Sequence, residues 1–375
     1  MSSKNFNWGP ALFIIIYQSI LIVSLPFLLY YAPPSWSIFF ASFVLLYLTG
    51  LSITAGYHRL FAHRSYKTNS VVESIILFFG TMAVQGSALR WGFDHRIHHA
   101  HADTDEDPYS ISKGFWYAHF LWILEKPRPI DPKVVPDLMK NKLVQFQHRH
   151  YTTLMVLTNA IAVFFVGWIL NDYVEAFFYA CWLRIFCLHH FTWFINSLAH
   201  TWGDKPFCQE QSAVNNYVIA LLTFGEGYHN FHHTFANDYR NGIRWYHFDP
   251  TKWLIWTLHK CGLTHSLRQM DPLTISKRMV LERKQLLLDR MCDLWYLKRE
   301  ELEKKISDLS EKLVHEFAQF NLLRVQYRAA RKTREKALKR AIKQELAQLK
   351  KALKADWREW VLLSRSIMRM HPLKT

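Results

Sequence analysis

The sequence contains few cysteines, glycines and prolines for its 375 residues. None of its five cysteines stands in a Cys-x-x-Cys pair, which argues against thiolate zinc sites, disulfide frameworks and fused iron–sulfur carriers. With 13 glycines, 13 prolines and an apolar content of 50%, the chain is neither collagen-like nor mostly disordered. What it has in excess is histidine, of which there are 20, and positive charge, with a formal net charge of +16.

Four long apolar stretches predict helices that cross a membrane, because each is long enough to span a hydrocarbon core of about 30 Å. Ala32-Pro33-Pro34 joins the first two and Asn171-Asp172 joins the last two, so we expect two helical hairpins. Both termini would then share the side that carries most basic residues, which the positive-inside rule makes cytoplasmic. The predicted spans are residues 10–31, 35–56, 152–170 and 173–196.

The last hundred residues differ in character from the rest. Residues 276–375 contain 26 Lys and Arg against 13 Asp and Glu, and neither glycine nor proline occurs from Leu273 to His371. Apolar residues at helical spacing predict a helical seam along Leu302, Ile306, Leu309, Leu313, Phe317 and Phe320. We therefore divide the chain into a membrane domain, residues 1–272, and a basic helical tail, residues 273–375.

Two interpretations of the tail remain open. It is either a solvated helical hairpin or coiled coil, or a basic amphipathic surface that lies on anionic lipid headgroups or binds an acidic partner. Nucleic acid is not an expected partner, since no reader motif accompanies the charge.

Histidines gather in three clusters beside the predicted spans. In the second and third clusters the i, i+3, i+4 spacing places three imidazoles on one helical face. In the first, a spacing of five turns about 140° around an α-helix, so we expect that helix to end or unwind between the two rings. A further pair, Asn196 and His200, leaves the fourth span. The clusters are HRLFAH (His58, His63), HRIHH (His95, His98, His99) and HNFHH (His229, His232, His233).

Nine such imidazoles suit two metal ions at four or five nitrogens each, whereas burying neutral imidazole for packing alone costs desolvation. The ligand type is compatible with Zn, Cu, Fe or Ni and does not name the metal. Asp94 and Glu226 stand next to the second and third clusters and are candidates to orient ring N–H groups.

These three boxes, set among four spans, resemble those of the membrane fatty acid desaturases. The wider similarity covers about residues 8–272, including the stretches GEGYHNFHH (225–233) and WYHFDPTKW (245–253). Within the family the sequence is most similar to the Δ9 acyl-CoA (stearoyl-CoA type) branch. The resemblance implies an all-α integral membrane fold, four transmembrane helices under a cytosolic helical cap that holds a diiron (Fe²⁺) centre.

The resemblance also implies roles for individual residues. The nine box histidines, His200 included, would be the metal ligands, and Asn196 would act through a metal-bound water; no other catalytic residue is expected. Trp91 and Gln85 match positions in the wall of the acyl-chain tunnel. Phe93 stands where related enzymes carry an arginine near the thioester, so CoA contacts would fall to Arg90, Arg240 and Arg244.

The implied reaction is O₂-dependent insertion of a cis double bond, at Δ9, into a saturated fatty acyl chain, with acyl-CoA as the expected substrate. Breaking an unactivated C–H bond needs O₂, a redox metal and two electrons, which favours iron over zinc. Since no HPGG motif is present, the electrons would come from a separate cytochrome b5 or ferredoxin.

Three alternatives remain open. The same scaffold supports a hydroxylase or other oxygenase, an acyl-lipid desaturase also fits, and a membrane scaffold with an inactive centre is the non-enzymatic choice. As location the sequence favours a bacterial inner membrane over the endoplasmic reticulum, because only nine residues precede the first span and no cytochrome module is visible.

Overall fold

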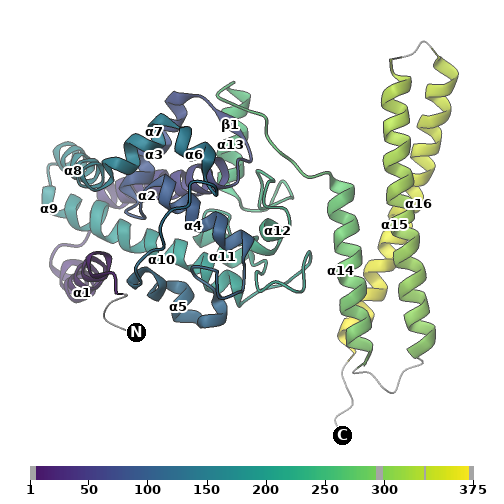
Figure 1. The fold of residues 1–375 in the computed structure, drawn as a ribbon, viewed down its shortest axis with the longest axis horizontal. Coiled ribbons are helices and arrows are strands. Elements are labelled where there is room, and N and C mark those ends of the chain that lie inside the picture. The colour runs from purple at the N-terminus through teal and green to yellow at the C-terminus, as the bar shows by residue number, and fades with distance from the viewer. Residues whose placement is uncertain (1–5, 293–298, 333–334, 371–375) are drawn as a thin grey trace, which may run out of the picture. The chain divides into compact units, whose positions relative to one another are not determined.

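The computed structural model describes residues 6–292, 299–332 and 335–370 and is mostly helical (Figure 1). It divides into two compact units, here called the body and the tail. The body comprises Met1–Lys205 and Glu210–Gln269, and the tail comprises Pro206–Gln209 and Met270–Thr375. This division lies close to the boundary that the composition predicts.

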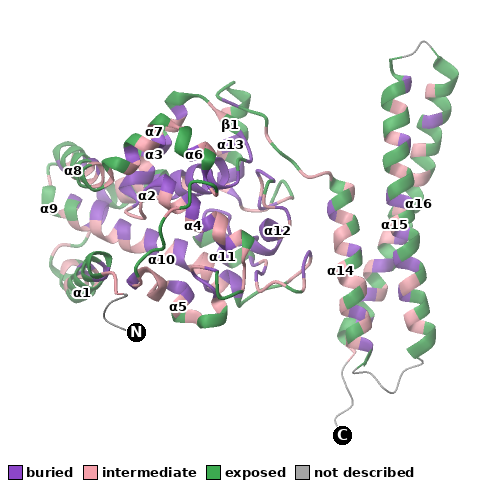
Figure 2. Cartoon of the chain, viewed as in Figure 1, coloured by how far each residue is buried: buried purple, intermediate pink, exposed green. Residues whose placement is uncertain are grey.

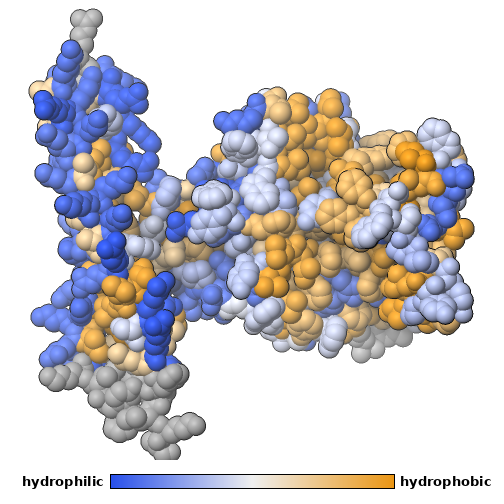
Figure 3. Space-filling view, turned by 180° about the vertical axis from the view of Figure 1, so that it is seen from behind, coloured by the Kyte–Doolittle hydropathy of each residue, from blue (hydrophilic) through white to orange (hydrophobic). Residues whose placement is uncertain are grey.

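Within the described residues, three helices of the body are long and apolar enough to cross a membrane. They are α1 (Trp8–Tyr31), α2 (Trp36–Leu51) together with its continuation η2 (Ser52–Ala62), and α8 (Tyr151–Leu170). Apolar side chains cover much of the surface of the body (Figure 3), as expected for helices that face lipid.

The fourth predicted span is helical throughout but is not among these three. It consists of α9 (Tyr173–Glu175), the π-helix η5 (Ala176–Leu183) and α10 (Arg184–Asn196). Its Arg184 is buried and donates hydrogen bonds to Asn159 Oδ1 at 2.5 Å and to the carbonyl oxygen of Met82 at 3.1 Å. Polar residues such as Arg184 lower the mean hydropathy of this segment, which explains why it is not among the three candidate spans. The arrangement of four spans in two hairpins therefore stays a prediction.

The second span extends beyond its predicted end at residue 56 and ends at Ala62, between His58 and His63. It widens into the π-helix η2, in which the backbone N–H of His63 donates to the carbonyl oxygen of His58 at 3.0 Å. A π-helix bonds residue i to residue i+5, so a spacing of five returns to the same face. The expectation that the helix ends or unwinds between the two rings is confirmed, since η2 ends at Ala62, and the wider turn is what aligns the rings.

Short helices between α2 and α8 and after α10 cover the histidine clusters. A two-residue ladder joins the start and the end of this cap, with Lys67 opposite His265 and Thr68 opposite Thr264. These elements are β1 (Lys67–Thr68), α3 (Ser70–Met82), α4 (Ala88–Ala100), η3 (Ile111–Lys113), α5 (Phe115–His119), η4 (Leu121–Leu124), α6 (Pro136–Lys140), α7 (Lys142–Arg149), η6 (Leu198–His200), α11 (Tyr217–Leu222), α12 (His229–Thr234), α13 (Pro250–Lys260) and β2 (Thr264–His265).

Burial is concentrated in η2, α4 and α12, and Figure 2 shows purple segments at α4 and α12. Every residue of η2 is buried, and Phe93 of α4 and Phe231 of α12 are 2% and 1% exposed. The histidine clusters thus lie in the most closely packed part of the body.

The tail consists of α14 (Pro272–Cys292), α15 (Arg299–Ala330) and α16 (Lys336–Arg369), packed around its own apolar core. The predicted helical seam forms the side of this core that α15 contributes. Ile306, Leu309, Leu313 and Phe317 are buried there, and Leu302 packs against them. These residues meet Trp360 and Ile367 of α16, so the hairpin is held by side-chain packing.

A buried carboxyl pair inside the tail predicts a pH-dependent stability. Burial, together with the hydrogen bond and charge of Asp356, raises the pKa of Glu316 from 4.5 to about 7. The folded tail therefore holds this proton more tightly than the unfolded chain does. The resulting stability is fully present below pH 4.5 and is lost as the pH rises through about 7.

We expect hydrogen-exchange protection of α15 and α16, corrected for intrinsic rates, to fall several-fold between about pH 5 and about pH 8. Glu316→Gln removes that dependence. Glu311→Gln serves as the control, because Glu311 is exposed on the same helix, and it should leave the pH dependence unchanged. A pH dependence retained in Glu316→Gln contradicts the assignment.

Candidate metal centre

The structure brings all nine box histidines together in two groups. Within each group the candidate ligand nitrogens lie within 4.8 Å of one another. The first group is His58, His63, His95, His99 and His232, and the second is His98, His200, His229 and His233.

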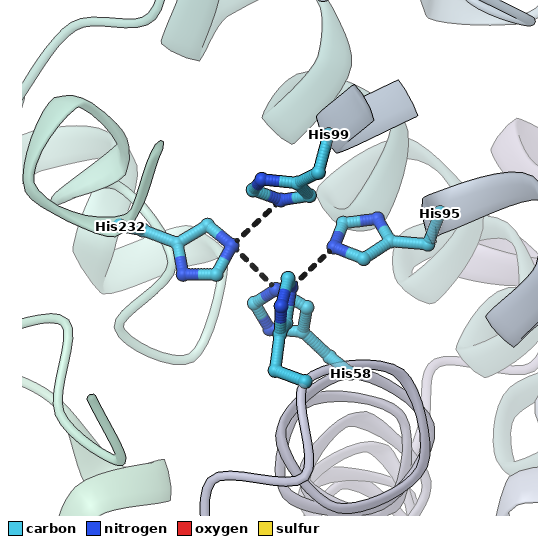
Figure 4. A group of neighbouring side chains, drawn as sticks. His58, His95, His99 and His232 are labelled. Atoms are coloured by element: carbon cyan, nitrogen blue, oxygen red, sulfur yellow. Dashed lines mark hydrogen bonds between the residues drawn. The ribbon is translucent and has the colours of Figure 1, made fainter. Parts of the chain in front are cut away.

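The rings of each group point their Nε2 atoms at a common centre. In the first group, the distance from His232 Nε2 is 2.9 Å to His58 Nε2 and 3.0 Å to His99 Nε2 (Figure 4). His63 and His95 approach each other to 2.8 Å by the same atoms. In the second group His229 Nε2 is 3.1 Å from both His200 Nε2 and His233 Nε2.

These distances fit a metal ion better than they fit hydrogen bonding. Two nitrogens bound to one ion at about 2.1 Å and at right angles are about 3.0 Å apart. A neutral imidazole carries only one N–H, so a ring of converging Nε2 atoms is not satisfied by donor and acceptor pairs alone. The donor set and its spacing therefore suit two metal ions, one in each group.

Local helix geometry explains why these residues meet. His95, His98 and His99 lie on α4 at the predicted i, i+3, i+4 spacing, and α12 repeats that spacing. The histidines of each helix are divided between the two groups. His98 of α4 and His233 of α12 belong to the second group, whereas His99 and His232 belong to the first. The two helices thus supply ligands to both groups.

Burial keeps these imidazoles neutral, as metal ligation requires. Burial lowers the pKa of His95, His99 and His233 well below the usual value, and neighbouring histidines lower it further. The pKa of His200 falls to about 3, again mainly by burial. Each Nε2 lone pair is therefore available at neutral pH.

The Nδ1 side of the His58 ring is held by a buried ionic network. Glu226 lies 3.0 Å from His58 Nδ1 and accepts from Arg59 at 2.8 Å. Arg59 also donates to Asp249 at 3.0 Å. Burial alone would raise the pKa of Glu226, but Arg59 and His58 outweigh it and lower that pKa to about 2. A carboxylate therefore accepts from this ring, as expected for Glu226.

The second histidine cluster is oriented by residues that the sequence reasoning missed. Asp107 places both carboxylate oxygens 2.9 Å from His98 Nδ1, and both side chains are buried. The Tyr109 hydroxyl is 3.1 Å from His95 Nδ1. The sequence feature that could have indicated Asp107 and Tyr109 is the acidic stretch DTDEDPY (103–109), which follows HRIHH.

His200 is held in a similar way. Its Nδ1 lies 2.6 Å from the hydroxyl oxygen of Ser212, and that hydroxyl is in turn hydrogen bonded to Asp103. The backbone N–H of Ser212 also donates to Asp103, at 2.8 Å. No spacing rule relates these residues, because Ser212 and Asp103 reach His200, the last residue of η6, from two separate loops.

Asp94 does not orient a ring among the contacts described. It accepts hydrogen bonds from Arg90 Nε at 2.8 Å and from Arg90 Nη2 at 2.5 Å. Arg240 is likewise paired, with Asp238 at 2.8 Å, whereas Arg244 is exposed. Two of the three arginines predicted to contact CoA are thus already bound to carboxylates.

Of the two predicted tunnel residues, Trp91 contacts a candidate ligand. Trp91 stacks on the His95 ring with 4.7 Å between centroids. Gln85 donates to the hydroxyl of Thr192 on α10 at 3.0 Å. Asn196 is the last residue of α10 and is partly exposed, and its role through a water stays a prediction.

The histidines that the motifs left out lie outside both groups. His101 is 41% exposed and lies 3.3 Å from Glu106, in keeping with the cap surface. His189 is buried and lies 2.8 Å from the Tyr17 hydroxyl. His190 approaches His119 at 3.1 Å. These are polar contacts in the interior or at the surface, outside both groups of candidate ligands.

Comparison with known proteins agrees with this site. The family model described as "Fatty acid desaturase" matches residues 34–266. The chain is 45% identical to "Probable acyl-CoA desaturase" of Schizosaccharomyces pombe, over 64% of this chain and 51% of that protein. It is 39% identical to "Acyl-CoA desaturase 1" of Saccharomyces cerevisiae, over 74% and 54%. It is 33% identical to "sn-1 stearoyl-lipid 9-desaturase" of Anabaena variabilis, over 63% and 86%. The aligned region thus spans about half the length of each yeast relative.

Proposed function

The chain belongs to the fatty acid desaturase family, and from this we propose that it introduces a cis double bond, at Δ9, into a saturated fatty acyl chain. The observation that carries the proposal is the pair of converging imidazole groups. The names of the relatives support the activity, and that of the Anabaena protein supports Δ9.

In this proposal the two histidine groups hold two iron ions, with Asn196 acting through a water. When bound, the iron centre supplies O₂ activation and the oxidising power needed to break unactivated C–H bonds. The protein's part is to hold nine neutral imidazoles in place and to keep them dry. Glu226, Asp107, Tyr109 and Ser212 fix the ring orientations.

Trp91 and Gln85 position the acyl chain in the proposal. Trp91 lies against the His95 ring, so a chain that passes it lies beside the first histidine group. The hydrogen bond between Gln85 and Thr192 joins the α3–α4 connection to α10. Both residues would measure the distance from the polar end of the substrate to the metal centre.

We propose acyl-CoA as the substrate, with acyl-lipid as the alternative. The two yeast relatives are named for acyl-CoA and the Anabaena relative for an acyl lipid. Phe93 in place of the family's arginine, and the pairing of Arg90 and Arg240 with carboxylates, favour the alternative. Arg244 is the exposed candidate for a phosphate contact.

A separate electron carrier, cytochrome b5 or a ferredoxin, completes the proposal. The chain is a membrane protein, and its cap would face the cytoplasm. The bacterial inner membrane stays the location predicted from sequence, while the higher identity to the two yeast relatives favours the endoplasmic reticulum.

Expression in a cell that requires unsaturated fatty acids tests the function. The wild-type chain is expected to rescue growth and to yield cis-monounsaturated chains in gas chromatography of total lipid. His98→Ala is expected to do neither. Hydroxylated chains without rescue would identify an oxygenase instead. Rescue by His98→Ala, or purified protein without iron, would favour a non-enzymatic scaffold.

Asp107→Asn is expected to weaken metal binding by about 10- to 100-fold, because the amide no longer accepts the His98 N–H as a carboxylate does. Metal content after dialysis against graded chelator concentrations measures the change. Asp94→Asn is the matched control, since that carboxylate is bound to Arg90 and should leave metal retention unaltered. Equal metal loss in both variants would count against the role of Asp107.

A further inference from the structure

Between Lys336 and Arg358, one face of the tail helix α16 carries seven exposed basic residues, and the exposed Arg365 and Arg369 continue the same face. At 3.6 residues per turn the seven fall within about 100° of the helix circumference, and they extend over about 33 Å of its length. Lys339, which is partly exposed, borders the same face. The seven are Lys336, Arg340, Lys343, Lys350, Lys351, Lys354 and Arg358, here called the basic stripe.

The side chains of the basic stripe do not take part in the packing of the tail. α16 packs through a different face, on which Trp360 and Ile367 are buried. Its carboxylates Asp356 and Glu359 pair with Lys312 and Lys305 of α15, at 2.8 Å and 3.2 Å. Within the described part of the chain no carboxylate is in ion-pair contact with any of the seven stripe residues.

The adjoining half of the hairpin adds to this charge. Residues 317–332, the distal half of α15 and the turn after it, contain four basic residues and no acidic one. The acidic residues of α15, from Glu300 to Glu316, all lie in its other half. Positive charge is therefore in excess toward this end of the tail, although Arg324 is paired with Asp271 at 3.1 Å.

We propose that the basic stripe binds the anionic headgroups of a lipid bilayer. Five of the nine basic residues on this face are lysines and no aromatic residue of α16 lies on it, whereas protein interfaces are depleted in lysine and enriched in aromatic residues. A straight row of cations also matches a planar layer of charge. The proposal does not depend on the proposed enzymatic function.

A lipid bilayer is always close to the tail, because the three candidate spans of the body keep the chain in a membrane. The bilayer bound by the stripe is either the one that holds the body or a neighbouring one. The chemistry is the same in both cases, and the experiment below includes both.

Lysine labelling of the full chain tests the proposal. The chain is placed in nanodiscs of phosphatidylcholine alone, in discs with about 30% phosphatidylglycerol, and in neutral discs mixed with separate vesicles of that anionic composition. An amine-reactive ester is applied, and mass spectrometry measures each lysine. We expect stripe labelling to fall at least about fivefold in one of the anionic arms and to recover in about 0.5 M salt. Lys304 and Lys305, exposed on α15 among acidic residues, are the internal controls.

A charge variant separates lipid binding from a nonspecific change. Replacing Lys343, Lys350 and Lys354 by glutamine together should abolish the protection that remains measurable at Lys336 and Lys351. The matched variant Lys304→Gln with Lys305→Gln should retain it. Unchanged labelling in both anionic arms overturns the proposal. So does protection by an acidic soluble protein when anionic lipid gives none.

Discussion

Replacing His99 by alanine is expected to lower double-bond formation by more than about 100-fold and to reduce bound iron from about two ions per chain toward one. His99 Nε2 lies 3.0 Å from His232 Nε2 and belongs to the five-residue group. Alanine removes a ligand from that group, while all four rings of the other group remain. Elemental analysis of the purified chain, together with lipid profiling of cells that express it, measures both effects.

His101→Ala is the matched control, because His101 follows on the same segment, is 41% exposed and belongs to neither group. It should retain both iron ions and full activity. His200→Ala removes a ligand from the four-residue group and is likewise expected to reduce bound iron from about two ions per chain toward one. If His99→Ala kept two iron ions per chain, the assignment of five histidines to one ion would have to be abandoned.

Replacing Arg59 by methionine is expected to destabilise the body by about 3–5 kcal/mol. The reason is that Glu226 and Asp249, whose side chains are 1% and 0% exposed, would lose the cation that both contact. Two buried carboxylates without a counter-charge are costly to keep ionised. Thermal unfolding of the chain in detergent, followed by tryptophan fluorescence, measures the loss.

Arg90→Met provides the comparison. Arg90 and Asp94 also form an ion pair, but their side chains are 21% and 14% exposed and one helix turn apart. A pair of this kind contributes about 1 kcal/mol or less. A destabilisation by Arg59→Met no larger than that by Arg90→Met would mean that the buried network is not needed for stability. Arg59→Lys keeps the positive charge but lacks the planar guanidinium group. Its loss of stability is expected to lie between those of Arg59→Met and Arg90→Met.

The histidine boxes could be predicted from sequence because their signal is local. The i, i+3, i+4 spacing of His95, His98 and His99 requires only an α-helix, and α4 is one. The two helices α4 and α12 then bring rings from distant boxes together. What spacing does not decide is which ring belongs to which ion, and both helices divide their histidines between the two groups.

The groups behind the rings could not be predicted in the same way. Asp107 reaches His98 across a loop, and Ser212 with Asp103 reaches His200 from two separate loops. Asp94 was the nearer carboxylate in sequence, but it lies on the same helix as Arg90 at a spacing of four and pairs with it. Proximity along the chain was therefore the wrong guide to contact with a ring.

The π-helix η2 marks the limit of reasoning from ideal α-helical geometry. The spacing of five predicted that the helix ends or unwinds between His58 and His63, but it did not predict the wider π-helical turn that brings both rings to one face. The hairpin core of the tail, in contrast, followed from an ordinary seam because long regular helices obey the expected period.

The distribution of ligands along the chain also sets an order of events during synthesis. The five-residue group draws on residues from His58 to His232, and the four-residue group ends at His233. At about 5–20 residues per second, roughly 10 to 30 seconds separate translation of the first box from that of the last. During this interval α1 and α2 are already available for insertion, while the first box waits without its partners. The centre can therefore close only after α12 has emerged, so the supply of metal matters late in synthesis and not at its start.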